Sequence, residues 1–164
     1  MDILRLSEDL QNKISAGEVV ERPSSVVKEL LENSLDAGAK QIDIVIEQGG
    51  NQLIQVRDNG IAIKKDQLPN ALKRFHTSKL SNLNDLFTID TLGFRGEALA
   101  SIASVAQVSI ISNDERSEGS EISVIDGNLS DVIPAPKIDG TQITIRDLFY
   151  NTPARKKFLK TPRT

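Results

Sequence analysis

The spacing of apolar residues divides the chain into helices at the start and paired strands afterwards. Apolar residues recur every three or four positions from Ser25 to Gly38, which predicts an amphipathic helix. We expect an earlier helix that follows Ser7 and ends near Gly17, and later helices over 66–74, 97–106 and after Thr152-Pro153. Alternating patterns predict strands over 42–47, 53–56, 108–111, 122–125, 129–133 and 141–146.

This order of elements predicts a fold class. Helices followed by hairpins are typical of an α/β (α+β) two-layer sandwich, in which helices cover one face of a mixed, mostly antiparallel sheet. A doubly wound parallel sheet would alternate strands and helices more regularly. The 164 residues are enough for one domain with its own core, so we expect residues 1–164 to form a single domain.

The helix expected over 25–38 sorts its residues into two faces. The expected apolar face comprises Val27, Leu30, Leu31 and Leu35. Glu29, Asn33 and Asp36 form a stripe on the other side, one turn apart. A carboxylate can polarise a water molecule, and a carboxamide oxygen is a hard ligand that suits Mg²⁺. The alternative is an ordinary solvated helix face.

Composition excludes several classes of site. The chain has no cysteine, which excludes disulfides, thiolate zinc sites and a cysteine nucleophile. Its single histidine, His76, argues against a histidine metal site or a serine triad. No apolar stretch is long enough to span a membrane, and the first residues do not form a secretory signal.

Charge is unevenly distributed along the chain. The last ten residues, 155–164, carry five positive charges and no acid, so the rest carries −8 against −3 for the whole chain. A basic end on an acidic body is typical of a protein with an anionic partner such as nucleic acid. The alternative is a solvated basic helix.

Two strand ends carry candidate binding groups. Asp58-Asn59-Gly60-Ile61-Ala62 follows the second strand, where a buried carboxylate could accept a hydrogen bond from an exocyclic amine. Gly60 would let a flat ring approach the backbone. An ordinary turn is the alternative for this sequence. Thr141, which opens the last strand, could support Asp58 if the two strands are neighbours.

A glycine-rich loop before a helix is the third candidate. Its residues are Leu92, Gly93, Phe94, Arg95, Gly96, Glu97, Ala98 and Leu99, and Thr77, Ser78 and Lys79 precede it. Backbone N–H groups at a helix N-terminus bind phosphate, and Lys79 and Arg95 add positive charge. The loop is neither a P-loop nor a dinucleotide fingerprint, because GxxxxGK[ST] and GxGxxG are absent.

The order of these elements resembles the GHKL (Bergerat) ATP-binding fold of DNA gyrase, large chaperones, sensor histidine kinases and MutL. Four segments closely resemble the MutL family of DNA mismatch repair proteins. These are ISAGEVVERP over 14–23, VKELLENSLDAG over 27–38, GFRGEALASI over 93–102 and DLFYNTPAR over 147–155. Because the four matches are long and spread over the whole chain, the chain is identified as similar to the N-terminal part of that family.

The resemblance implies roles for individual residues. Glu29 would be the general base that activates water, and Asn33 would coordinate the Mg²⁺ that bridges the ATP phosphates. Asp58 would bind the adenine amino group, with Thr141 nearby. Thr77, Ser78, Lys79 and the loop over 93–99 would form a lid over the phosphates. The implied nucleotide-binding set further includes Asp36, Ala37, Gly60, Ala62 and Leu92.

Three departures from the family pattern matter. Ala62 stands where the adenine-side pattern Asp-x-Gly-x-Gly has its last glycine, so we expect weaker nucleotide binding or a local backbone adjustment. Arg74-Phe75-His76 differs in order from many relatives, and we assign His76 no catalytic role. The family's ATPase region continues past Thr164 into a subdomain that supplies a lysine to the terminal phosphate, and a C-terminal dimerisation region follows. We therefore expect this chain to bind nucleotide weakly and to hydrolyse it poorly.

The resemblance also implies partners and a location. ATP would promote association of two N-terminal domains and gate contacts with a mismatch-recognition protein, DNA and a downstream nuclease or helicase. The location would be the cytoplasm and nucleoid of a bacterium or the nucleus of a eukaryote. The alternatives are a gyrase-type or chaperone-type ATPase, a sensor kinase, and a DNA-binding module that needs no nucleotide.

Overall fold

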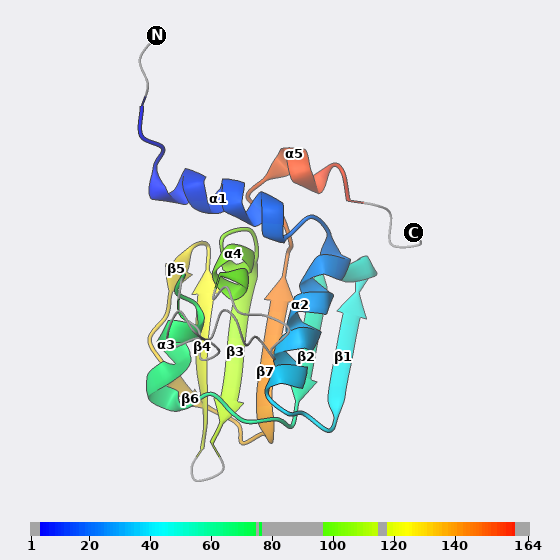
Figure 1. Ribbon diagram of the computed structural model, residues 1–164, viewed down its shortest axis with the longest axis vertical. Helices are drawn as coiled ribbons and strands as arrows, with labels where there is room; N and C mark the ends of the chain where they lie inside the picture. The colour runs from blue at the N-terminus through cyan, green and yellow to red at the C-terminus, as the bar shows by residue number, and fades with distance from the viewer. Residues whose placement is uncertain (1–3, 75, 77–96, 115–117, 160–164) are drawn as a thin grey trace, which may run out of the picture.

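The computed structural model describes residues 4–74, 76, 97–114 and 118–159 (Figure 1). Its helices are α1 (Glu8–Val19), α2 (Pro23–Asp36), α3 (Leu68–Ala71), α4 (Ala98–Ala103) and α5 (Pro153–Lys156), with 3-10 turns η1 (Gln48–Gly50) and η2 (Lys65–Gln67). Its strands are β1 (Ile42–Glu47), β2 (Leu53–Asp58), β3 (Gln107–Asn113), β4 (Gly119–Ile125), β5 (Asn128–Leu129), β6 (Ile133–Ala135) and β7 (Gly140–Arg146).

The strands form one seven-stranded sheet with the order β1-β2-β7-β3-β4-β5, and β6 pairs with β4. Each pairing among the described strands is antiparallel. Helices α2, α3 and α4 lie over the same face of the sheet (Figure 1), so the expected two-layer architecture is confirmed. The last strand, β7, lies between β2 and β3, which places Thr141 opposite Asp58.

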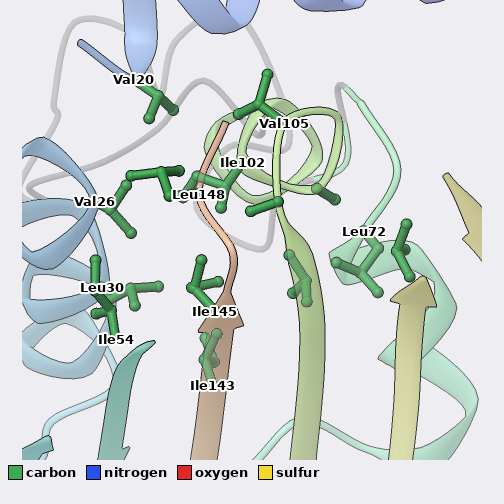
Figure 2. Close-up of a cluster of buried hydrophobic side chains, with 14 of the residues drawn as sticks. Val20, Val26, Leu30, Ile54, Leu72, Ile102, Val105, Ile143, Ile145 and Leu148 are labelled. Carbon is green, nitrogen blue, oxygen red and sulfur yellow. The ribbon is translucent and has the colours of Figure 1, made fainter. Parts of the chain in front are cut away.

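The core consists of two apolar rows that run across the central strands on the helix side. The first row is Ile54, Ile145, Val108 and Val124, and the second is Val56, Ile143, Ile110 and Ile122. Val26 and Leu30 of α2 and Ile102 of α4 pack onto these rows (Figure 2). Burial of aliphatic side chains from both layers holds the helices on the sheet.

Helix boundaries follow local chemistry and differ in part from the expected ones. Ser7 caps α1 by accepting a hydrogen bond from the Leu10 N–H, and α1 continues past Gly17 to Val19. Pro23 stands in the first turn of α2, where its missing N–H costs nothing. The single helix expected over 66–74 is wrong. That segment contains the end of η2 and the one-turn helix α3, because Pro69 restarts the helix.

Strand β1 is an edge strand whose apolar residues are only partly covered. Ile44, Val45 and Ile46 are each more than 40% exposed, because α2 lies over the neighbouring strand β2 (Figure 1). The alternating pattern therefore predicted correctly that this segment is a strand paired with β2, but it did not predict how exposed the strand is.

Candidate functional site

Helix α2 carries Glu29, Asn33 and Asp36 at positions one turn apart, and all three side chains are half-buried. Ala37, which follows the helix, is also half-buried. Glu29 lines a hollow of about 220 Å³ between the end of α1 and the first turns of α2. Glu18, Glu21 and Glu32 line the same hollow. A carboxylate at an open, acidic hollow has access to water.

The buried face of α2 is not the one that the apolar pattern predicts. Leu35 is 54% exposed, and Ser34 is 3% exposed. The helix buries Val26, Leu30 and Ser34. The buried face is therefore turned about the helix axis away from the face that the sequence predicts. Asn33 lies about 60° from Leu30 at 100° per residue. Asn33 therefore borders the buried face rather than opposing it.

Asp58 ends strand β2 and is 8% exposed. Its Oδ2 accepts a hydrogen bond from the Ser34 hydroxyl at 2.9 Å, and its Oδ1 accepts one from the Gly60 N–H at 2.9 Å. Two donors therefore hold the carboxylate in one orientation. Because Ser34 follows Asn33, the same hydrogen bond places this turn of α2 over the end of β2.

The loop after Asp58 is fixed against the end of α2. A Cβ on Gly60 would lie 2.7 Å from the Ala37 carbonyl oxygen, so the close approach that this glycine permits in the structure is to Ala37. The Ile61 N–H donates to the same carbonyl at 2.8 Å. Asn59 Oδ1 accepts hydrogen bonds from two backbone N–H groups of the loop that follows α2, at 2.8 Å each. Ala62 follows this loop and is half-buried.

A buried polar row continues across the sheet below the two apolar rows. It comprises Asp58 on β2, Thr141 on β7, Ser112 on β3 and Ser120 on β4, which are successive cross-strand partners. Thr141 is 6% exposed, and its Oγ1 lies 2.8 Å from Ser112 Oγ. Gly140 has φ +76°, and a Cβ there would lie 2.2 Å from the Asp58 carbonyl oxygen. Only glycine allows β7 to approach β2 so closely.

Asp58, Thr141 and Ser112 of this row are the strongest structural sign of a site. A core that served only for stability would be apolar at this level, because buried polar groups cost free energy unless they are paired. Sequence reasoning missed Ser34 and Ser112, and it named Asn59 only as part of the motif over 58–62. The useful signal was their chemistry at core positions: Ser34 and Ser112 stand where the helical and alternating patterns would place an apolar residue.

The remaining predicted residues are only partly within the described chain. Thr77, Ser78, Lys79, Leu92, Gly93, Phe94, Arg95 and Gly96 lie outside the described residues. Glu97 precedes α4 and pairs with Arg74 at 3.3 Å, and Arg74 also donates to Asn12 of α1 at 2.9 Å. Ala98 begins α4, and Leu99 packs against the core.

The basic C-terminal segment is partly used for packing. Arg155 donates to the Gly17 carbonyl oxygen at 3.0 Å and lies over the Phe149 ring at 4.9 Å from its centroid. This side chain therefore holds the end of α1 beside α5, the arrangement visible in Figure 1. Lys156 and Lys157 are exposed. The end of the chain thus offers fewer free cations than the sequence suggests.

Residues 21–144 match the family of histidine kinase-, DNA gyrase B- and HSP90-like ATPases. Because that match covers most of the chain, the chain belongs to this ATPase family.

Individual relatives confirm the resemblance to MutL. The whole chain is 53% identical to the DNA mismatch repair protein MutL of Xanthomonas oryzae, of which it covers 26%. The Aquifex aeolicus MutL ATPase domain complexed with ADP matches 88% of this chain and 50% of its own, with a TM-score of 0.64 and 36% identity. The N-terminal domain of a DNA repair protein matches 89% of this chain and 41% of its own, with a TM-score of 0.73 and 31% identity.

The chain spans about a quarter of the length of the curated relatives. Among the residues that the structure describes, none of the helices has the length and apolar character to cross a membrane.

Proposed function

We propose that residues 1–164 form the ATP-binding domain of a DNA mismatch repair protein of the MutL type, in which Mg²⁺-dependent binding and slow hydrolysis of ATP act as a conformational switch. The observation that carries this proposal is the buried Asp58 carboxylate, fixed by Ser34 and Gly60 and opposed by Thr141. A buried acceptor of this kind is suited to an amine on a flat heterocycle.

Asp58 would accept a hydrogen bond from the adenine 6-amino group, with Thr141 beside it. The loop over 58–62 would lie along the base, since it is fastened to Ala37 and to the segment after α2. Asp36, Ala37, Gly60 and Ala62 would contribute to the same pocket. The relative from Aquifex aeolicus, whose ATPase domain is complexed with ADP, supports nucleotide binding by this fold.

The phosphate end of the nucleotide would lie towards Glu29 and Asn33. The donor chemistry fits Mg²⁺, because a carboxamide oxygen suits a cation that keeps most of its ligands from phosphate and water. The described residues contain no group of three or more His, Cys, Asp or Glu side chains that could hold a metal by themselves. When bound, Mg²⁺ would neutralise phosphate charge. Glu29, at its open hollow, would orient and deprotonate the attacking water.

The residues outside the described chain, Thr77, Ser78, Lys79 and Leu92 to Gly96, would complete the phosphate site together with Glu97, Ala98 and Leu99.

The switch would act through association of two copies. Helix α1 and the residues before it expose Leu6, Leu10 and Ile14, spaced four residues apart, at 43–51%. This apolar stripe, which begins just before α1 and continues along the helix, suits packing against a second copy when ATP is bound. We further propose that the ATP state controls contacts with a mismatch-recognition protein, DNA and a downstream nuclease or helicase, in the bacterial cytoplasm and nucleoid or in the eukaryotic nucleus.

Calorimetric titration with ADP, with and without Mg²⁺, tests this function. The unaltered chain should bind ADP, Asp58→Ala should lose binding, and Asn33→Ala should lose the gain in affinity that Mg²⁺ provides. Asp131→Ala and Asn128→Ala, which change exposed side chains at the far edge of the sheet, are the matched controls and should bind normally. Equal binding by Asp58→Ala and Asp131→Ala would refute the proposed site.

A further inference from the structure

Ser112 lies in the polar row but in none of the motifs that predict the nucleotide site. It is 2% exposed, and its Oγ has three polar neighbours. The Ile63 N–H donates to it at 2.8 Å, Thr141 Oγ1 lies at 2.8 Å, and the Gly140 carbonyl oxygen lies at 3.2 Å. Ser112 thus contacts the loop after β2 and the first two residues of β7. These contacts place it next to the residues of the proposed base pocket.

A serine hydroxyl has one proton to donate and two lone pairs to accept with. The Ile63 N–H can only donate, so it uses one lone pair of Ser112. The single Ser112 proton then goes either to the Gly140 carbonyl or to Thr141 Oγ1. In the first case Thr141 must donate its own proton to Ser112, and it presents only lone pairs to the pocket. In the second case the Thr141 proton remains available for a ligand.

The acceptor chemistry of Asp58 determines which of these two proton arrangements fits the bound base. Its carboxylate accepts from an exocyclic amine and repels an exocyclic carbonyl, so it selects the amino edge of adenine. On that edge the amine lies next to N1, which is an acceptor. Thr141, the cross-strand neighbour of Asp58, must therefore donate a hydrogen bond towards N1. It does so directly or through one water molecule that accepts from Thr141 and donates to N1. This requires the second arrangement, in which Ser112 donates to Thr141 over the shorter contact.

We propose that Ser112 is a positioning residue for base selection: by donating its proton to Thr141, it makes the Thr141 hydroxyl a donor towards adenine N1. The inference rests on the proposed nucleotide site. Without the Ser112 hydroxyl, Thr141 would lose the partner that fixes its orientation, and the pocket would distinguish less well between a ring nitrogen and a ring C–H at this position.

The test compares ADP with 1-deaza-ADP, in which N1 is replaced by C–H and the amine is kept. One neutral hydrogen bond contributes about 1 kcal/mol, so the unaltered chain should bind ADP several-fold to tenfold more tightly than the analogue. In Ser112→Ala this ratio should fall to below about twofold, while in Ser112→Thr, which keeps the hydroxyl, it should persist. Calorimetry gives both dissociation constants for each variant.

Ser120→Ala is the matched control, because Ser120 is a buried serine opposite Ser112 on the neighbouring strand and one strand further from Thr141. It should keep the ratio. Ser112→Cys, which keeps a similar shape but is a weak donor, should also lower the ratio and replaces the alanine variant if that one does not fold.

The outcomes separate this inference from the function on which it rests. If the unaltered chain does not bind ADP, the proposed function fails and this inference fails with it. If ADP binds but the ratio is unchanged in Ser112→Ala or Ser112→Cys, only the role of Ser112 is overturned. A ratio that collapses equally in Ser120→Ala would also overturn it, because a general effect on the sheet would then be the cause.

Discussion

Replacing Ser34 with alanine should loosen the carboxylate on which the proposed base pocket depends. The Ser34 hydroxyl is buried in α2 and donates to Asp58 Oδ2 at 2.9 Å. Its removal leaves the 8% exposed carboxylate with one fixed donor, the Gly60 N–H, and with an oxygen that the alanine cannot satisfy. The change should therefore reduce both the stability of the fold and the affinity for ADP.

The size of the effect follows from the charge of the acceptor. A hydrogen bond to a charged group contributes about 1.5–3 kcal/mol net. Alanine recovers about 0.5 kcal/mol through its higher helix propensity. The free energy of unfolding should thus fall by about 1–2.5 kcal/mol, which for a chain of this length lowers Tm by about 2–10 °C.

Urea unfolding followed by circular dichroism, without nucleotide, measures this loss. Ser101→Ala is the matched control, because Ser101 is also 3% exposed and also lies in a helix, α4. It gains the same helix propensity without touching Asp58. If the two variants differ by less than about 0.5 kcal/mol, the hydrogen bond to Asp58 does not carry the stability assigned to it, and the argument for a fixed carboxylate is refuted.

Other changes test the remaining contacts. Gly140→Ala should cost more than about 2 kcal/mol and abolish ADP binding, because it puts a side chain at φ +76° and against the Asp58 carbonyl; a loss below about 1 kcal/mol in urea unfolding would contradict this. Arg155→Ala should speed hydrogen exchange of the amides near Gly17, because it removes the bond to that carbonyl; unchanged exchange would count against the packing role. Tyr150 is the only tyrosine and there is no tryptophan, so phenolate absorbance follows it alone. Burial, then a nearby carboxylate, raises the pKa of Tyr150 above 10.0. Tyr150 should therefore titrate at higher pH in the folded chain than in the unfolded chain. The free energy of unfolding that depends on the neutral phenol is fully present below pH 10 and is lost as the pH rises through the folded pKa. Equal midpoints would contradict this.

The sequence predicted the elements better than it predicted their faces. Alternation predicts the longer strands β1, β2, β3, β4 and β7, and the pairing of β2 with β7 explains why Asp58 and Thr141 meet. The single strand expected over 129–133 is wrong, because the chain forms two short strands there, β5 and β6, with no strand over 130–132. The position of β7 between β2 and β3 does not follow from local pattern, since pairing between distant strands is decided by the packing of the whole sheet. The last strand was predicted, but its neighbours were not.

The face of α2 shows why hydrophobic pattern fails at a site. Leu35 is apolar and largely exposed, while Ser34 is polar and buried. Pattern reasoning assigns the core to the apolar residue, because burial of a hydroxyl is normally unfavourable. Here the hydroxyl is paired with Asp58, and that partner lies 24 residues away on another element. The sequence places Ser34 among apolar positions, but its partner is identified only when the fold brings the two groups together.

The most direct test of the account is the base preference of Asp58→Asn, measured by calorimetry with ADP and inosine diphosphate. The unaltered chain should prefer ADP, because the Asp58 carboxylate accepts from the adenine amine and repels the hypoxanthine carbonyl. A hydrogen bond to a charged acceptor is worth about 1.5–3 kcal/mol, so the preference should be at least about tenfold. In Asp58→Asn it should fall to near parity or reverse. The same preference in both proteins would show that Asp58 does not read the base, and would contradict the proposed nucleotide site.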